Sequence, residues 1–205
     1  MKDMEIIEEF ERLVAKYAGC KYGVAISSCT NAIFLSLEYL KYIDEIEIHD
    51  TITIPSHTFV SVPCQIKHAG LNIRFKNRRW FGIYQLEPTR IFDCATRFTK
   101  DMYVGGEALQ CVSFQYKKIL KLGRGGMILT NDEMAVEWLK MARINGRHPN
   151  ISRHDEELEF CGWDAYMTPA DAARGIELFK QIREYNEDVG GHRYYPDISK
   201  YEVFK

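Results

Sequence analysis

Short apolar runs and amphipathic helical segments alternate along most of this chain, and the alternation limits the folds it can adopt. Residues 4–17 place apolar side chains on one face at helical spacing, and Gly19 then ends the predicted helix. The same reasoning predicts further helices over residues 28–43, 59–70 and 132–145 and within 162–179. Apolar runs between the helices predict strands over residues 22–27, 51–55, 71–76, 90–95, 109–114 and 125–131.

This order of elements indicates an α/β fold. Short, continuously apolar strands are typical of a sheet that is covered on both faces, and helices between strands provide the crossovers that parallel strands need. We therefore predict a three-layer structure, a mostly parallel sheet with helices on both faces. The 205 residues suffice for one sizeable core.

Composition argues against two classes of partner. The formal net charge is −2, so the chain has no general attraction for nucleic acid or for anionic membrane surfaces. The apolar runs are shorter than the roughly 20 residues that span a bilayer, and the acidic first ten residues do not resemble a signal peptide. We expect a cytoplasmic protein.

The cysteines and histidines show no metal-binding pattern. The six cysteines are scattered without a C-x-x-C pair, which is typical of reduced, mostly buried thiols. No two of the six histidines lie three or four residues apart. We therefore expect no metal site.

Chemistry in a parallel sheet belongs at the carboxyl ends of its strands, and the first of these ends is rich in hydroxyl groups. Residues 27–31 lead from a predicted strand into a helix and include Ser28, Cys29, Thr30 and Asn31. Free backbone N–H groups at a helix start can hold a phosphate. The alternative is an ordinary helix cap by Ser28 or Thr30 without a ligand.

Two further strand ends carry an aromatic ring and a carboxylate. Phe59 follows the strand over 51–55 and can either stack on a planar ligand or belong to the core. Asp93 ends an apolar strand, where a buried carboxylate needs a cationic partner. A protonated ring nitrogen or the nearby Arg97 would serve, and both remain open.

A fourth strand end carries a pair of lysines. Ser113 offers another hydroxyl, and Lys117 and Lys118 lie between the strand over 109–114 and glycines at 123, 125 and 126. A lysine that forms a Schiff base must be held at a fixed position so that its amine reaches one carbon atom, and glycines let the chain turn back into the sheet. The alternative is two solvated lysines. Taken together, the four ends supply the phosphate anchor, ring stack, pyridinium partner and amine that pyridoxal 5'-phosphate requires.

These residues also resemble a known family, the DegT/StrS-like sugar aminotransferases of fold type I. The resemblance runs from about residue 8 to 180 with one internal gap. It is carried by FERLVAKYAGCKYGVAISSCTNAIFLSL, PSHTFVSV, FDCA, SFQYKKILKLGRGGMILTND, MARINGR and GWDAYMTPADAARGIELF. The spacing from Ser113 to the glycines matches the family pattern with Lys118, and not Lys117, as the Schiff-base lysine.

The resemblance implies a role for each matching residue. Lys118 would form the Schiff base and move a proton, Asp93 would hold the pyridine nitrogen protonated, and Phe59 would stack on the ring. The other implied cofactor-binding residues are Ser28, Cys29, Thr30, Asn31, Thr96 and Ser113. The implied reaction transfers an amino group from an amino acid, usually glutamate, to a keto group of a nucleotide-linked sugar, in a homodimer with a shared active site.

The chain also departs from the family pattern. Cys29 replaces a glycine, Thr96 a glutamine and Arg124 a glutamate, and Asp164 stands near a position where the family usually has asparagine. Decarboxylation, elimination or dehydration on the same scaffold, or a non-catalytic binding role, are therefore alternatives to transamination.

Two departures concern architecture. Several dozen family residues, a strand and a helix among them, are missing between residues 76 and 90, so we expect a reduced sheet. We expect residues 1–185 to form the aminotransferase-like large domain, without most of the family's small C-terminal domain. Residues 186–205 would form a tail that packs across the dimer.

Overall fold

The computed structural model describes residues 3–152 and 154–204. Its strands are β1 (Tyr22–Ile26), β2 (Thr51–Pro55), β3 (Asn72–Lys76), β4 (Tyr84–Gln85), β5 (Ile91–Asp93), β6 (Leu109–Ser113) and β7 (Gly126–Thr130). Its α-helices are α1 (Asp3–Ala18), α2 (Cys29–Tyr42), α3 (Ser61–His68), α4 (Glu133–Ala142) and α5 (Pro169–Phe179). Short 3-10 turns η1 (His192–Tyr194), η2 (Ile198–Lys200) and η3 (Glu202–Phe204) follow. Each predicted helix and strand is present, within slightly different bounds, whereas β4 was not predicted.

The strands form one five-stranded sheet, in the order β1-β7-β6-β5-β4, and a parallel pair β2-β3. Backbone hydrogen bonds of 2.7 and 3.0 Å between Thr53 and Glu87 join β2 to the chain just after β4. Strand β7 is antiparallel to both β1 and β6, and β5 is parallel to β6. Strands β1, β5 and β6 therefore run in the same direction. The antiparallel Thr53–Glu87 bridge gives β2 and β3 that direction too, since β4 is antiparallel to β5. Five strands thus run one way and only β4 and β7 oppose them, which confirms the mostly parallel prediction even though neighbouring pairs are mixed.

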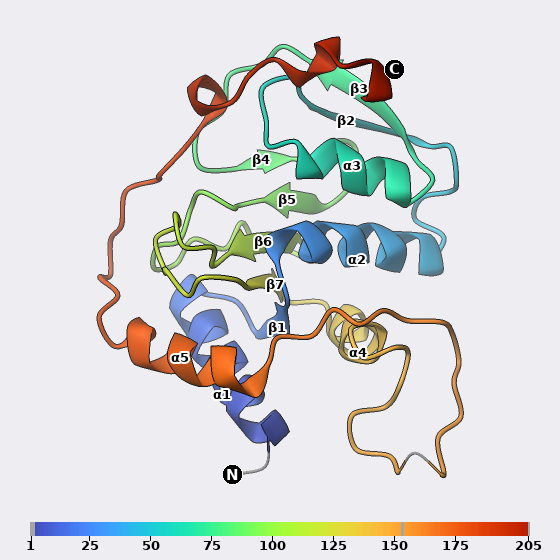
Figure 1. Cartoon of the computed structure of the whole chain (residues 1–205), viewed down its shortest axis with the longest axis vertical. Coiled ribbons are helices and arrows are strands. Elements are labelled where there is room, and N and C mark those ends of the chain that lie inside the picture. Colours follow the sequence, from blue (N-terminus) through green and yellow to red (C-terminus); the bar gives the residue numbers. More distant parts are fainter. Residues whose placement is uncertain (1–2, 153, 205) are drawn as a thin grey trace.

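Helices cover both faces of the sheet (Figure 1). On one face, α2, α3 and α4 pack with inward side chains such as Val24, Ile128 and Cys111. On the other face, α1 and α5 pack over alternate residues of the same strands, such as Ala25 and Met127. This is the period-2 alternation of a sheet buried on both sides, and it confirms the three-layer prediction.

The cysteines mostly belong to these cores, as expected. Cys29, Cys94 and Cys111 are buried, Cys20 and Cys64 are half-buried, and Cys161 is exposed. Burial raises the pKa of Cys111 to about 12, so its thiol stays protonated and inert. Within residues 3–152 and 154–204, no helix has both the length and the apolar character needed to cross a membrane.

A buried ion pair joins three elements at the β1 edge of the sheet. Arg143, which follows α4 and is 1% exposed, donates from one Nη to the Glu11 carboxylate of α1 and to the Ala25 carbonyl of β1, at 2.8 Å from the latter. Glu11 also accepts the Ala25 N–H at 2.8 Å. The two charged groups keep these contacts only while α1, β1 and the end of α4 stay in register.

We expect the Glu11→Ala substitution to destabilise the fold by about 3–5 kcal/mol, because it leaves the Arg143 guanidinium buried and unpaired. Chemical denaturation measures the loss. The control is Glu177→Ala, which breaks the solvent-exposed Glu177–Lys180 pair and should change the unfolding free energy very little. Equal effects of the two substitutions would mean that the buried pair does not hold these elements together.

Candidate active site

A cavity of about 440 Å³ lies at the carboxyl ends of β5 and β6. Its walls come from the start of α2, the start of α3, the loop after β6 and the segment after α5. Figure 1 shows that last segment rising along the left side of the molecule, past these strand ends, to the 3-10 turns beside β2 and β3. The four strand ends singled out in the sequence therefore meet around one hollow.

Asp93 lies at the inner wall of the cavity, at the end of β5, and is 6% exposed. Its Oδ2 accepts a hydrogen bond from the Tyr84 hydroxyl at 2.7 Å, and its Oδ1 accepts the Ala95 N–H at 2.8 Å. Burial raises the pKa of Asp93, and these two bonds and the charge of Lys118 offset part of the rise. Among the residues that the structure describes, no cationic side chain lies within ion-pair distance of Asp93.

Arg97 was the alternative partner for Asp93, and that alternative is wrong. The guanidinium instead makes a bidentate pair with Asp188, with Nη2 2.7 Å and Nε 3.0 Å from its carboxylate oxygens. This pair anchors the segment after α5 to the end of β5. The carboxylate of Asp93 consequently keeps unused lone pairs that face the cavity.

Of the two neighbouring lysines, Lys118 is the one whose charge influences the Asp93 carboxylate. Residues 114–125 form a closed loop in which the Phe114 N–H donates to the Gly125 carbonyl at 3.0 Å and the Lys118 N–H donates to the Gln115 carbonyl at 2.8 Å. Both lysines line the cavity, but Lys117 is exposed and its Nζ lies over the Tyr116 ring. The charge of Lys118, which is half-buried, lowers the pKa of Asp93 and of the Cys29 thiol.

Glycines hold the lysine loop against the start of α2. Gly125 has φ +133°, a conformation that other residues avoid, and it bridges to Ser28. A Cβ on Gly126 would lie 2.4 Å from the backbone nitrogen of Cys29. The two elements therefore approach each other at backbone distance, which only glycine permits.

The start of α2 presents backbone N–H groups and hydroxyls to the cavity. Ser28 caps the helix by accepting the Asn31 N–H at 3.1 Å, and its contact with a phosphate stays a prediction. Thr30 lines the cavity and donates to the Ser61 hydroxyl at 3.0 Å, which brings in a second hydroxyl from α3. Cys29 occupies the first helical position without a positive φ, so a cysteine fits where the family has glycine.

The remaining predicted residues lie in different settings. Phe59 is 54% exposed at the cavity wall, and its ring meets Tyr195 edge-on at 6.3 Å. Thr96 lines the cavity, but its hydroxyl donates to the Gly82 and Gly190 carbonyls, both at 3.1 Å. The predicted residues that line the cavity are Cys29, Thr30, Phe59, Asp93, Thr96 and Lys118.

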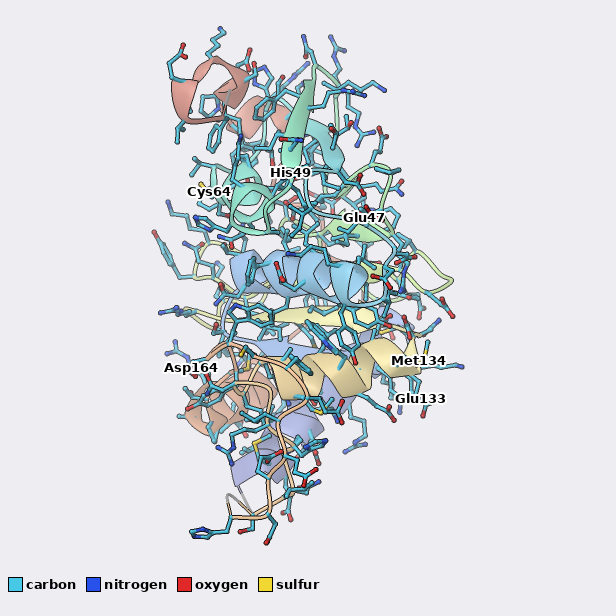
Figure 2. The ribbon with its side chains drawn as sticks, turned by 90° about the vertical axis from the view of Figure 1, so that its right-hand side faces the viewer. Glu47, His49, Cys64, Glu133, Met134 and Asp164 are labelled. Carbon is cyan, nitrogen blue, oxygen red and sulfur yellow. The ribbon has the colours of Figure 1, made fainter. Side chains whose placement is uncertain are left out.

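Three predicted residues stand beside the cavity without lining it. Ser28 is the cap described above, and the Asn31 amide donates to the Ser27 hydroxyl at 2.9 Å. The hydroxyl of Ser113, which is buried, accepts the Gln115 N–H at 3.4 Å. Asp164, which was left without a role, is exposed and lies level with α4, well below α3 (Figure 2).

Sequence reasoning missed the aromatic wall of the cavity. Trp80 stacks on Tyr195 with ring centroids 5.9 Å apart, and its indole N–H donates to the His57 carbonyl at 2.8 Å. Tyr195 is close enough to Asp93 that burial and this carboxylate together raise the pKa of its phenol to about 12. Further lining residues that were not predicted are Ile33, Thr58, Ser61, Val62, Ala95, Gln115, Val189 and Tyr194. Residues 77–89 and 190–204 carry no helix or strand periodicity, so only their density of aromatic side chains gave a signal.

The segment after α5 packs against its own chain. Gly82 donates to the Gly190 carbonyl at 2.9 Å, His192 to the Trp80 carbonyl at 3.1 Å and Ile198 to the Ser56 carbonyl at 2.9 Å. The backbone of residues 190–198 is thus bonded to the strand ends of the same chain, and packing of this tail across a dimer stays a prediction.

Comparison with known proteins agrees with this architecture. Among curated proteins, the GDP-perosamine synthase of Caulobacter vibrioides is 21% identical over 87% of this chain and 57% of its own length. Among solved structures, AtS13 of Actinomadura melliaura has a TM-score of 0.73 at 19% identity, over 86% of this chain and 60% of that one. The E. coli GDP-4-keto-6-deoxy-D-mannose-3-dehydratase with bound hydrated PLP has a TM-score of 0.68 at 17% identity, over 86% and 60%.

The shared fold is that of these enzymes, and the chain spans 57–60% of the length of the curated relatives it matches. A model of the DegT/DnrJ/EryC1/StrS aminotransferase family matches residues 3–79 and 90–189, which is most of the chain. The matched ranges contain the start of α2, Asp93 and the lysine loop. The chain belongs to the DegT/DnrJ/EryC1/StrS aminotransferase family.

Proposed function

We propose that this chain binds pyridoxal phosphate and transfers an amino group from an amino acid, with glutamate as the expected donor, to a keto group of a nucleotide-linked sugar. The observation that carries the proposal is the Asp93 carboxylate, which is buried, forms no ion pair among the described residues, and shares the cavity lining with Lys118, whose charge reaches it. Burying such a carboxylate costs free energy that a bound cation would offset.

The residues around the cavity fit the cofactor. The free lone pairs of Asp93 match a protonated ring nitrogen, which would neutralise the buried charge. The start of α2 supplies N–H groups and the positive end of a helix dipole for a phosphate, with the Thr30 and Ser61 hydroxyls beside it. Phe59 and Tyr195 offer ring faces or edges at the cavity wall.

When bound, pyridoxal phosphate supplies an aldehyde that joins amines and a ring that accepts electron density from the substrate carbon. In this chain, the amine of Lys118, which lines the cavity and whose charge reaches Asp93, would join the cofactor and then move a proton to or from the substrate. Asp93 would keep the ring nitrogen protonated, and Trp80 and Tyr195 would exclude water from that side of the site.

A second reaction has a specific observation in its favour. The fold is shared with a sugar dehydratase that carries the same cofactor, so removal of a hydroxyl group from a sugar is the nearest alternative. Decarboxylation or elimination, and a non-catalytic binding role, are further alternatives.

We also propose a homodimer, since Phe59, Tyr116 and Tyr194 leave exposed aromatic surface beside the cavity. A cytoplasmic location stays a prediction.

We expect wild-type protein mixed with pyridoxal phosphate to develop a visible absorption band that the Lys118→Ala variant lacks, because the link to the lysine amine produces the band. The matched control is Lys117→Ala, whose ammonium lies over the Tyr116 ring and which should keep the band. Spectra recorded during a cofactor titration measure both. A band that depends on Lys117 would reverse the assignment.

A second spectrum separates transamination from the alternatives. We expect L-glutamate to bleach the wild-type band, with one equivalent of 2-oxoglutarate released per bound cofactor, since the first half of a transamination leaves the amino group on the cofactor. Stoichiometric product analysis by mass spectrometry checks this outcome. A stable band with glutamate would exclude glutamate as donor and favour a different reaction.

A further inference from the structure

A chain of hydrogen bonds runs from Thr58, in the loop between β2 and α3, to the buried carboxylate of Asp93. The Thr58 hydroxyl lies 2.6 Å from the Tyr84 hydroxyl, which in turn lies 2.7 Å from Asp93 Oδ2. All three side chains are buried, and Trp80 packs on the Tyr84 ring with centroids 4.8 Å apart. Tyr84 and Asp93 are also register partners in the antiparallel β4–β5 pair, so the backbone fixes their separation.

The direction of the protons follows from the chemistry of the groups. An ionised carboxylate only accepts hydrogen bonds, so the Tyr84 hydroxyl donates to Asp93. The single proton of Tyr84 is then used, and its oxygen must accept the proton of Thr58. Each oxygen of Asp93 thus receives one bond from a neutral donor, Tyr84 on one side and the Ala95 N–H on the other.

The groups that face Asp93 from other elements are neutral with one exception. The thiols of Cys29, Cys94 and Cys111 surround it, and burial raises the pKa of each. The phenol of Tyr195 is likewise held neutral, with its pKa raised to about 12 by burial. Lys118 is the cation among the described residues whose charge reaches Asp93. Burial and the Asp93 charge also raise the pKa of Tyr84, so its hydroxyl remains a donor at any working pH.

Tyr84 comes from a part of the chain that the family model does not match. The match stops at residue 79 and resumes at residue 90, and β4 lies within that gap. The contact between Tyr84 and Asp93 is therefore supplied by a segment outside the residues that the family model matches.

We propose that Tyr84, held by Thr58, is a positioning residue that fixes the Asp93 carboxylate toward the cavity and sets its affinity for a protonated ring nitrogen. This inference rests on the proposed function. It gives β4 a role beyond extending the sheet, since Tyr84 brings a phenol to the buried Asp93 carboxylate of the cavity wall.

The test titrates pyridoxal phosphate into wild type, Tyr84→Phe and Thr58→Val and follows the visible band as a function of pH. We expect Tyr84→Phe to bind roughly 10- to 100-fold more weakly, the range for losing one hydrogen bond to a charged group. Without this donor the pKa of Asp93 rises. Binding should then be lost at a higher pH than in wild type when the solution is acidified. Thr58→Val should shift both quantities in the same direction by less.

The matched control is Tyr39→Phe, which removes a hydrogen bond of 3.0 Å from a buried tyrosine to Asp132, away from the cavity. It should leave the affinity and the pH midpoint as in wild type, although it removes the same kind of contact. If Tyr84→Phe fails to fold, Thr58→Val keeps both rings and decides the question alone.

The outcomes separate the two proposals. Absence of a band in wild type would contradict the proposed function itself. A wild-type band together with an affinity and pH midpoint in Tyr84→Phe, or in Thr58→Val if Tyr84→Phe does not fold, that equal those of Tyr39→Phe would overturn the positioning role alone and leave the cofactor proposal standing.

Discussion

The burial of one carboxylate organises this molecule. Asp93 sits at the end of a three-residue strand with almost no solvent exposure, and the surrounding elements supply what an ionised group needs there: a phenol from β4, an N–H from its own turn and a positive charge from the lysine loop. Neither hydrogen-bond donor is charged, and Arg97 is committed to Asp188. Among the described residues no cationic group forms an ion pair with Asp93, and a cofactor ring with a protonated nitrogen is the kind of ligand that would do so.

The walls of the cavity have two origins. The family-matched ranges contribute the start of α2, Asp93 and the lysine loop, which glycines hold at backbone distance from α2. Residues 80–89 and 190–204, outside the match, contribute Trp80, Tyr84 and Tyr195, and the two segments are bonded to each other through Gly82, Gly190 and His192. Because a stacked Trp80–Tyr195 pair covers one side of the cavity, these unmatched segments shape the space in which a substrate would lie.

Much of this structure follows from sequence pattern, and the exceptions have physical reasons. The strands and helices were predicted because the spacing of apolar residues along each segment shows which side chains are buried. The strand β4 was not predicted because two residues carry no period, and pairing with β5 alone makes them a strand. Whether Arg97 pairs with Asp93 was left open and the bond from Tyr84 to Asp93 was not predicted, for a related reason. Both contacts depend on where segments distant in sequence lie: Asp188 takes Arg97, and Thr58 holds the Tyr84 hydroxyl. Local sequence does not encode these positions.

The central claim is that one lysine, Lys118, faces the buried acid and holds the cofactor. The most direct measurement mixes wild-type protein with pyridoxal phosphate, adds sodium borohydride to make the cofactor–lysine link permanent, and locates the added mass by peptide sequencing in the mass spectrometer. We expect a single stoichiometric label on Lys118, with Lys117 unlabelled in the same peptide. Label on Lys117, or label spread over surface lysines with none enriched at Lys118, would contradict it.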